Sequence, residues 1–232
     1  MSIYSGAPHF LVAVDNIIFG FDGEKLKILL VHRHIEPEKG KWSLMGGFIG
    51  QNERPDTAAL RVVRELTGIS DIYMEHFEVF GEPQRDPIER TISIAYFTLI
   101  DINKYQHQIN HAYSAAWFPL ADAPQLIFDH DEMVKSALQK LRYKAALHPV
   151  LFELLPEKFT IPQITILYEE VYGIQLDKRN FARKLLSLEL LIKLNEKEKE
   201  SSKKGAFYYR LNEKNYKEKF GAMTKFIPFP YV

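Results

Sequence analysis

Apolar and polar positions in the first part of the chain follow the patterns of β-strands. Residues 10–21 and 26–33 are rich in β-branched and aromatic side chains, and Asp22-Gly23 between them readily supplies the positive φ of a tight hairpin turn. Similar runs cover residues 73–80 and 91–100, and a short one ends at Trp117-Phe118. Between these runs, residues 55–67 carry an apolar stripe at helical spacing, made of Ala59, Val62, Val63 and Leu66. The pattern predicts a mixed sheet with an inserted helix.

The second part of the chain changes to short helical patterns. A helix is expected to start after Asp129 as N-cap and to end near His148-Pro149, because proline restricts the residue before it. We therefore expect two domains, at residues 1–148 and 149–232. In the second domain, helical segments are predicted at 149–155, 161–172 and 177–188, followed by strands at 190–194 and 207–211 around a polar loop at 195–205. Three helices and a two-stranded ribbon predict a winged helix-turn-helix.

Composition narrows the class of protein. The chain has 232 residues, of which 46% are hydrophobic and 26% charged, and it contains no cysteine, which excludes disulfides and thiolate nucleophiles. No apolar run approaches the roughly 18 residues of a membrane-spanning helix, and the first residues do not resemble a secretory signal. We expect a cytoplasmic protein that does not contact membranes.

Net charge is zero overall but is distributed unevenly. Residues 1–150 hold 15 basic and 19 acidic side chains, whereas residues 151–232 hold 15 and 11. The local excess is largest at residues 177–225, with 14 basic and 7 acidic side chains. This excess favours a polyanionic partner if the basic groups share a face, although a solvated Lys/Glu surface is the alternative.

A spaced set of glycines and charged residues lies at the inserted helix. Gly47 is followed after five residues by Glu53, and after seven more by an Arg-Val-Val-Arg-Glu-Leu-Thr-Gly-Ile segment that includes Arg61 and Glu65. This resembles the Nudix box, a loop-helix-loop whose clustered carboxylates hold divalent metal against a diphosphate. The resemblance implies an α/β Nudix-like sandwich, with a mixed sheet between helices.

Two positions depart from the Nudix pattern. Val62 and Leu66 stand where the family has glutamates. Magnesium requires several oxygen ligands, which three helical carboxylates at i, i+3 and i+4 would supply. Glu65 cannot replace that cluster and is expected to pair with Arg61, four residues earlier, while Glu53 also pairs with Arg61 and braces the loop. We predict a degenerate box without metal, cofactor or catalytic residue, and therefore no enzyme activity.

Motifs outside the box resemble one branch of the superfamily, the Nudix-related transcriptional regulators. The resemblance covers nearly the whole chain and implies a Nudix-like effector domain followed by a DNA-binding winged helix. Members of this branch control NAD metabolism or sugar catabolism. The matching segments are residues 80–87, Arg90 with the following strand, 117–120, 128–131, 155–160, 168–169 and 177–185.

The segment at residues 177–188 is expected to be the recognition helix. Phe181, Leu185 and Leu188 should face inward, which leaves basic and amide side chains to contact phosphates and base edges in the major groove of an operator. The loop before Gly205 should form the wing and contact the DNA backbone or the minor groove. The candidate DNA-binding residues are Lys178, Arg179, Asn180, Arg183, Lys184, Lys203 and Lys204. Since most such regulators read near-palindromic sites, we expect a homodimer.

The sequence is compatible with more than one class of effector. With Val62 and Leu66 in the box, a metal-bridged diphosphate is disfavoured, so the sequence favours a pentose such as L-arabinose and a repressor of pentose-utilisation genes. An ADP-ribose-responsive regulator of NAD metabolism is the first alternative, with arginines holding the phosphates. An active Nudix hydrolase and a module that binds protein instead of DNA are the others. Candidate effector-binding residues are Trp42, Glu82, Arg85, Asp86 and Arg90.

Overall fold

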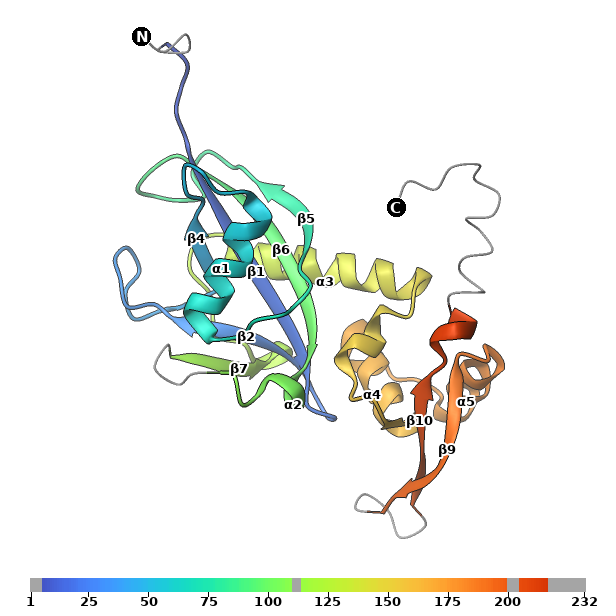
Figure 1. The fold of residues 1–232 in the computed structure, drawn as a ribbon. Helices are drawn as coiled ribbons and strands as arrows, with labels where there is room; N and C mark the ends of the chain where they lie inside the picture. Colours follow the sequence, from blue (N-terminus) through green and yellow to red (C-terminus); the bar gives the residue numbers. More distant parts are fainter. Residues whose placement is uncertain (1–5, 110–113, 200–204, 217–232) are drawn as a thin grey trace, which may run out of the picture. The chain divides into compact units, whose positions relative to one another are not determined.

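The chain divides into two compact units (Figure 1). The computed structural model describes residues 6–109, 114–199 and 205–216. The first unit ends at Leu154, six residues later than the boundary expected at residue 148. The difference is the 3-10 helix η3 (Val150–Leu154), whose buried Leu151 and Leu154 lie against strand β6 (Thr91–Asp101) of the first unit. The apolar face of this segment therefore completes the first unit instead of starting the second.

A seven-stranded mixed sheet forms the centre of the first unit. Strands β1 (Leu11–Phe21) and β2 (Leu26–His32) form the predicted antiparallel hairpin, with Phe21 opposite Leu26. β1 also pairs in parallel with β6 along the whole length of β1. β1 is therefore paired on both of its edges, with β6 on one and with β2 and β4 on the other. The strand order is β3-β2-β1-β6-β5, with β4 paired to β1 and β7 to β2. The bounds of the remaining strands are β3 (Trp42–Ser43), β4 (Met45–Phe48), β5 (Glu75–Phe80) and β7 (Ala115–Pro119).

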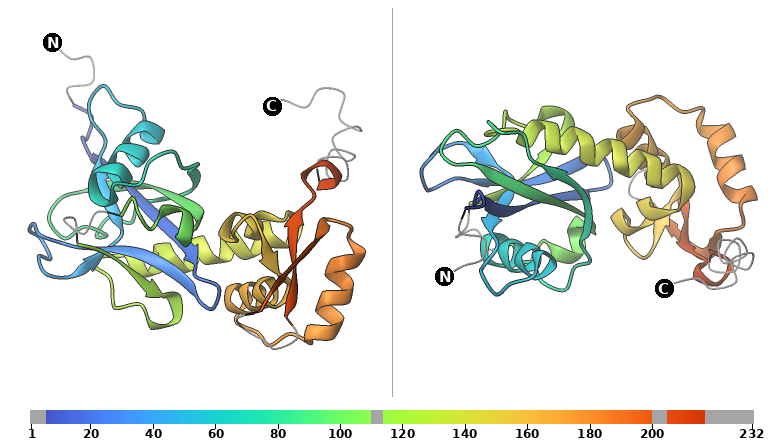
Figure 2. Two further views of the ribbon diagram at one scale, coloured as in Figure 1. Left: turned by 60° about the horizontal axis from the view of Figure 1, so that its bottom comes forward. Right: turned by 90° about the horizontal axis from the view of Figure 1, so that it is seen from above.

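The long helices α1 (Pro55–Thr67) and α3 (His130–Leu147) cover opposite faces of this sheet (Figure 2). α1 begins with proline at N1 and ends at Gly68, whose φ of 82° closes the helix in the left-handed conformation. The predicted stripe is buried at three of its four positions, while Leu66 is partly buried beside the core. Two short helices, α2 (Ile102–Tyr105) and η2 (Leu120–Asp122), lie in the connections.

Among its described residues, the second unit combines the helices α4 (Ile161–Tyr172) and α5 (Lys178–Ser187) with a three-stranded sheet. α4 matches its predicted range and begins with a capping box, in which Thr160 and Gln163 satisfy each other's backbone N–H groups. α5 follows after a turn and is capped by Asp177. The sheet order is β8-β10-β9, with β8 (Phe159–Thr160), β9 (Leu191–Glu198) and β10 (Ala206–Leu211). None of the described helices is long and apolar enough to cross a membrane.

The ribbon of the second unit is longer than the sequence pattern indicates. A polar loop was expected from residue 195, but β9 continues to Glu198 and pairs there with Ala206 of β10. The ammonium groups of Lys193 and Lys197 lie 3.7 and 4.5 Å from the ring centroid of Phe207. Polar residues can therefore continue this strand, because cross-strand pairing and cation–π contacts stabilise it without an apolar run.

Candidate effector pocket and DNA-binding surface

The segment that resembles the Nudix box is held together by Arg61. Its Nε and Nη2 donate to the two carboxylate oxygens of Glu53 at 2.8 and 2.9 Å, and its Nη1 donates to Glu65 at 3.1 Å. Nη2 also donates to the carbonyl of Phe48 at 3.0 Å. Both ion pairs expected from the sequence are formed, and they fix the loop after β4 to the middle of α1.

The electrostatics of this segment agree with its geometry. The hydrogen bonds from Arg61, with a further one from the backbone N–H of Gly50, lower the pKa of Glu53 to about 2, and the same ion pairs raise the pKa of Arg61. Glu53 is therefore ionised at neutral pH, and its carboxylate is already paired with the guanidinium of Arg61.

The residues of the box do not fit a divalent metal held in the Nudix manner. Val62 is 3% exposed, and its side chain lies so close to Gly47 that a Cβ added there would come within 2.6 Å of it. The Val62 side chain therefore packs against the loop and offers no metal ligand. Within the described residues, no group of three histidine, cysteine or acidic side chains could hold a metal ion. Because a hard cation needs several oxygen ligands, Glu53 and Glu65, both bound to Arg61, are a poor donor set.

A pocket of about 150 Å³ opens beside the box residues. It is bounded by β1, by β4 and the loop after β2, by the loop at residues 81–90 and by the start of α3. Two of the five predicted effector-binding residues, Arg85 and Asp86, line it. The other residues that line it are Ala13, Asp15, Arg33, Ile35, Ser43, Gly46, Gly47, Phe48, Thr91, Phe128 and His130.

The other three predicted effector residues do not line this pocket. The Trp42 ring packs edge-on against Phe118. Arg90 donates to the carbonyls of Gly81 and Glu82 and stacks on a phenylalanine ring, so it fastens the loop that carries Arg85. Arg90 acts here as a support for the pocket wall.

A buried group of charged side chains lies at the floor of the pocket. The side chains of Arg85 and Asp15 are 4% and 6% exposed. Arg85 donates from Nε and Nη2 to the two carboxylate oxygens of Asp129 at 2.8 and 2.7 Å, and Nη2 lies 3.4 Å from Asp15 Oδ2. The hydroxyl of Ser93 donates to the same Oδ2 at 2.6 Å. Charges this deeply buried are stable only as partners of one another.

His130 completes this floor. The backbone N–H of Leu44 donates to its Nδ1 at 3.2 Å, which places the ring proton on Nε2, 3.5 Å from Asp15 Oδ1. Burial lowers the pKa of His130, so the ring is neutral. Asp129 occupies the predicted N-cap position of α3, but its side chain does not cap the helix, because the carboxylate binds Arg85.

The sequence analysis missed Asp15 and His130 as pocket residues, and Ser93 as a hydrogen-bond partner of Asp15. A signal was available for Asp15, since it is the only charged residue in the apolar run at residues 11–21, and charged residues are seldom fully buried unless paired. Its partners could not be found in this way, because Arg85 lies 70 residues further along the chain.

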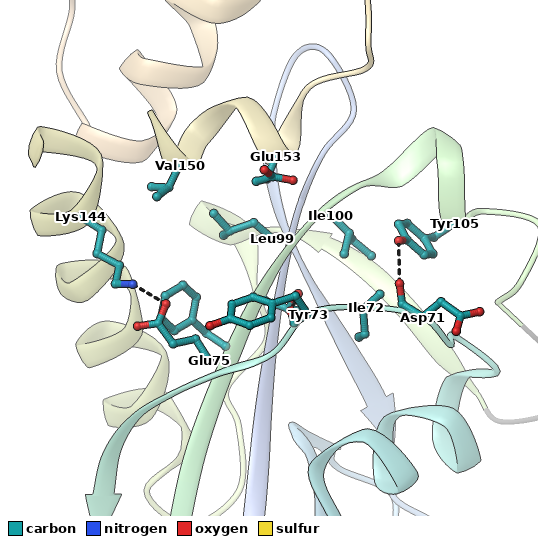
Figure 3. A pocket seen from close by; sticks show the side chains of 12 residues that line it. Asp71, Ile72, Tyr73, Glu75, Leu99, Ile100, Tyr105, Lys144, Val150 and Glu153 are labelled. Carbon is teal, nitrogen blue, oxygen red and sulfur yellow. Dashed lines mark hydrogen bonds and ion pairs between the residues drawn. The ribbon is translucent and has the colours of Figure 1, made fainter. Parts of the chain in front are cut away.

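A larger cavity of the first unit lies elsewhere. It measures about 460 Å³ and is bordered by β5, β6, α3 and η3 (Figure 3). Its side chains include Tyr73, Tyr105 and the ion pair between Lys144 and Glu75. It contains neither a residue of the box nor any of the predicted effector residues. The smaller pocket beside the box is therefore the better candidate for the effector.

The candidate DNA-binding surface lies on α5. Asp177 caps this helix by accepting hydrogen bonds from the N–H groups of Arg179 and Asn180 at 3.1 and 3.0 Å. Leu185 is buried, but Leu188, which was expected to face inward, is 51% exposed because the helix ends at Ser187. The exposed basic residues are Lys178, Arg179, Arg183 and Lys184, and Arg183 donates to the side chain of Asn180 at 2.8 Å. The wing residues Lys203 and Lys204 lie outside the described residues.

Comparison with known proteins finds a matching family for each of the two units. Residues 9–137 match the NUDIX domain family, and residues 151–211 match the NrtR DNA-binding winged helix domain. Over 226 residues, or 96% of this chain and 90% of the relative, the sequence is 31% identical to the "ADPR responsive transcriptional repressor NtrR" of Acinetobacter baylyi. The chain belongs to the NrtR family. The predicted combination of an α/β Nudix-like domain and a winged helix is thereby confirmed.

Two solved structures of another NrtR are also similar to this chain. The structure of Shewanella oneidensis NrtR complexed with a 27mer DNA shares 30% identity and a TM-score of 0.76, covering 88% of this chain and 95% of that one. The NUDIX domain of the same protein, complexed with ADP ribose, shares 28% identity and a TM-score of 0.52, covering 61% and 99%. Neither these proteins nor the matching families support the sugar-catabolism branch that the sequence analysis favoured.

Proposed function

We propose that this NrtR-family protein is a transcriptional repressor that binds operator DNA through its winged-helix unit and responds to ADP-ribose bound in its Nudix unit. The similarity to an ADPR responsive repressor over 96% of the chain carries this proposal. It favours the first alternative from the sequence analysis over a pentose-responsive repressor. We further propose that the protein acts as a homodimer on near-palindromic operators, as helix-turn-helix proteins commonly do.

The polar side chains of α5 support the DNA-binding part of the proposal. Arg179 and Arg183 can pair with guanine edges, and Asn180 with adenine, when a helix lies in the major groove. Lys178 and Lys184 are suited to contact phosphates, which position a helix on DNA without reading sequence. All five side chains come from one helix of ten residues, and this helix contains no acidic residue that would repel DNA.

An arginine at the wall of the pocket supports ADP-ribose as the effector. Among the described residues no group of side chains beside the pocket could hold a metal ion that screens a diphosphate, but Arg33 lines the pocket. Arg33 is more exposed than Arg85, and its guanidinium lies 5.9 Å from the ring centroid of Phe128. A guanidinium held in this way can bind phosphate oxygens directly, so a diphosphate can be held without a metal ion.

Binding of ADP-ribose should weaken binding of operator DNA by about 5- to 150-fold, the usual range of coupling between two sites. The measurement is a titration of fluorescent DNA fragments, taken from beside the protein's own gene, with and without saturating ADP-ribose. L-Arabinose, D-xylose and D-ribose serve as controls. Release of DNA by a free sugar but not by ADP-ribose would contradict the proposed effector.

The purified protein should not hydrolyse ADP-ribose appreciably in the presence of magnesium or manganese. Val62 and Leu66 supply no ligands, and without bound metal the phosphoryl oxygens are not polarised. The measurement is the release of AMP over several hours. Steady turnover that Glu65→Gln abolishes and Glu89→Gln leaves intact would show instead that the protein is an active Nudix hydrolase.

A further inference from the structure

Two polar atoms at the floor of the pocket lack a hydrogen-bond partner among the described residues. Arg85 uses Nε and Nη2 for its bonds to Asp129 and Asp15, and Nη1 makes none. Asp15 Oδ2 accepts from Ser93, whereas Oδ1 has only the Nε2 of His130 at 3.5 Å, which is too long for a good hydrogen bond. Nη1 is not sealed from solvent, because the fully buried atoms without a partner are on other residues. The floor thus offers one free donor beside one free acceptor.

The charge on this floor disfavours a phosphate. Two carboxylates, from Asp15 and Asp129, surround the single guanidinium of Arg85, and His130 beside them is neutral. An anion that reached Nη1 would meet both carboxylates at short range, where like charges repel strongly. A neutral group that both donates and accepts hydrogen bonds fits better, and a hydroxyl is such a group.

The size of the pocket limits what can enter it. The pocket has a volume of about 150 Å³, which is enough for a single six-membered ring. A whole dinucleotide needs a much larger volume, so only one part of ADP-ribose can enter the pocket. The ribose next to adenine is substituted at both ends and cannot fill a pocket with a closed floor. The terminal ribose is attached through one carbon only and carries several free hydroxyls.

We infer that Asp15 and Arg85 form a receptor for the terminal ribose of ADP-ribose, in which Asp15 Oδ1 accepts from a ribose hydroxyl and Arg85 Nη1 donates to one. This inference rests on the proposed function, in which ADP-ribose is the effector. It adds that the terminal ribose is the part of ADP-ribose that the floor of the pocket binds. The diphosphate then lies toward the opening, near Arg33. Adenine, the other ring attached at a single point, is the competing occupant.

The test compares ADP-ribose with ADP, which lacks the terminal ribose and carries one further ionisable phosphate oxygen in its place. Calorimetry on the full chain should show that the parent binds ADP-ribose about 10- to 100-fold more tightly than ADP, as expected for hydrogen bonds to charged groups. Asp15→Asn should remove most of that difference and leave the affinity for ADP within about twofold of the parent. Equal weakening of both ligands would place adenine at the floor and overturn the inference.

Asp71→Asn is the matched control, because Asp71 lines the larger cavity and its φ of 57° is a conformation that asparagine tolerates. It should bind both ligands like the parent, and a selective loss of ADP-ribose binding in this variant would move the site to the larger cavity.

If Asp15→Asn does not fold, the parent is tested with ADP-ribose lacking the terminal 2-hydroxyl, which should bind at least fivefold more weakly by the same reasoning. Equal affinity would overturn the inference.

The outcomes separate the two proposals. A parent protein that does not bind ADP-ribose refutes the proposed effector and the ribose receptor with it. A parent that binds ADP-ribose and ADP equally well retains the effector class, since the ligand is still bound, but has no ribose receptor.

Discussion

Replacing Arg85 by leucine should lower the free energy of unfolding of the first unit by about 3 to 5 kcal/mol, the usual cost of removing one partner from a buried ion pair. The change leaves the carboxylates of Asp15 and Asp129 without their shared cation, and the side chain of Asp15 is only 6% exposed. Leucine fills part of the volume, so the loss reflects the uncompensated charge more than a cavity.

The measurement can follow the first unit alone. Both tryptophans of the chain, Trp42 and Trp117, lie in it, so tryptophan fluorescence during denaturant unfolding reports on this unit even though the chain has two domains. Adding Asp15→Asn to the Arg85→Leu variant should restore part of the stability, because the unpaired charge is then removed.

Arg90→Leu is the matched control for this prediction. Arg90 lies on the same loop, but its guanidinium binds backbone carbonyls and is partly exposed, so about 1 kcal/mol is expected per lost hydrogen bond. A loss below about 1 kcal/mol in Arg85→Leu, or an equal loss in both variants, would contradict the idea that Asp15 depends on Arg85.

Removing Arg179 and Arg183 together should weaken operator binding by about 2 to 6 kcal/mol, if each reads a base and contributes about 1 to 3 kcal/mol. Both side chains are exposed on α5 and lie one helical turn apart. Since Arg183 also contacts Asn180, the two losses need not add, and single variants should be measured beside the double one.

The DNA measurement is made at several salt concentrations near physiological ionic strength. Loss of phosphate contacts flattens the salt dependence, whereas loss of base contacts relaxes sequence preference, so the two roles can be separated. Arg64→Ala, an exposed arginine on α1 of the first unit, is the control and should bind DNA like the parent. If the double variant also binds like the parent, α5 is not the recognition helix.

Some of the site was determined by the sequence itself because the interactions are local. Arg61 reaches Glu65 four residues later on one helix, and Glu53 lies on the loop leading into that helix, so the spacing of the box predicted both ion pairs. The range of α4 also followed from the sequence, since the capping box at Thr160 and Gln163 and the glycine at its end are read from neighbouring residues.

Other parts were decided only by the tertiary structure. Asp15, Arg85 and Asp129 come from three distant segments, and they meet because β1 pairs with β4 and β6 while the loop before β6 reaches the start of α3. The length of β9 depended likewise on pairing with β10, which its own polar residues do not indicate. The periodicity of a chain records which face of an element is buried, but it carries no information on which distant element covers that face. The sequence therefore determined the helices, the hairpin and the local ion pairs, and the packing of the sheet decided which charges share the floor of the pocket.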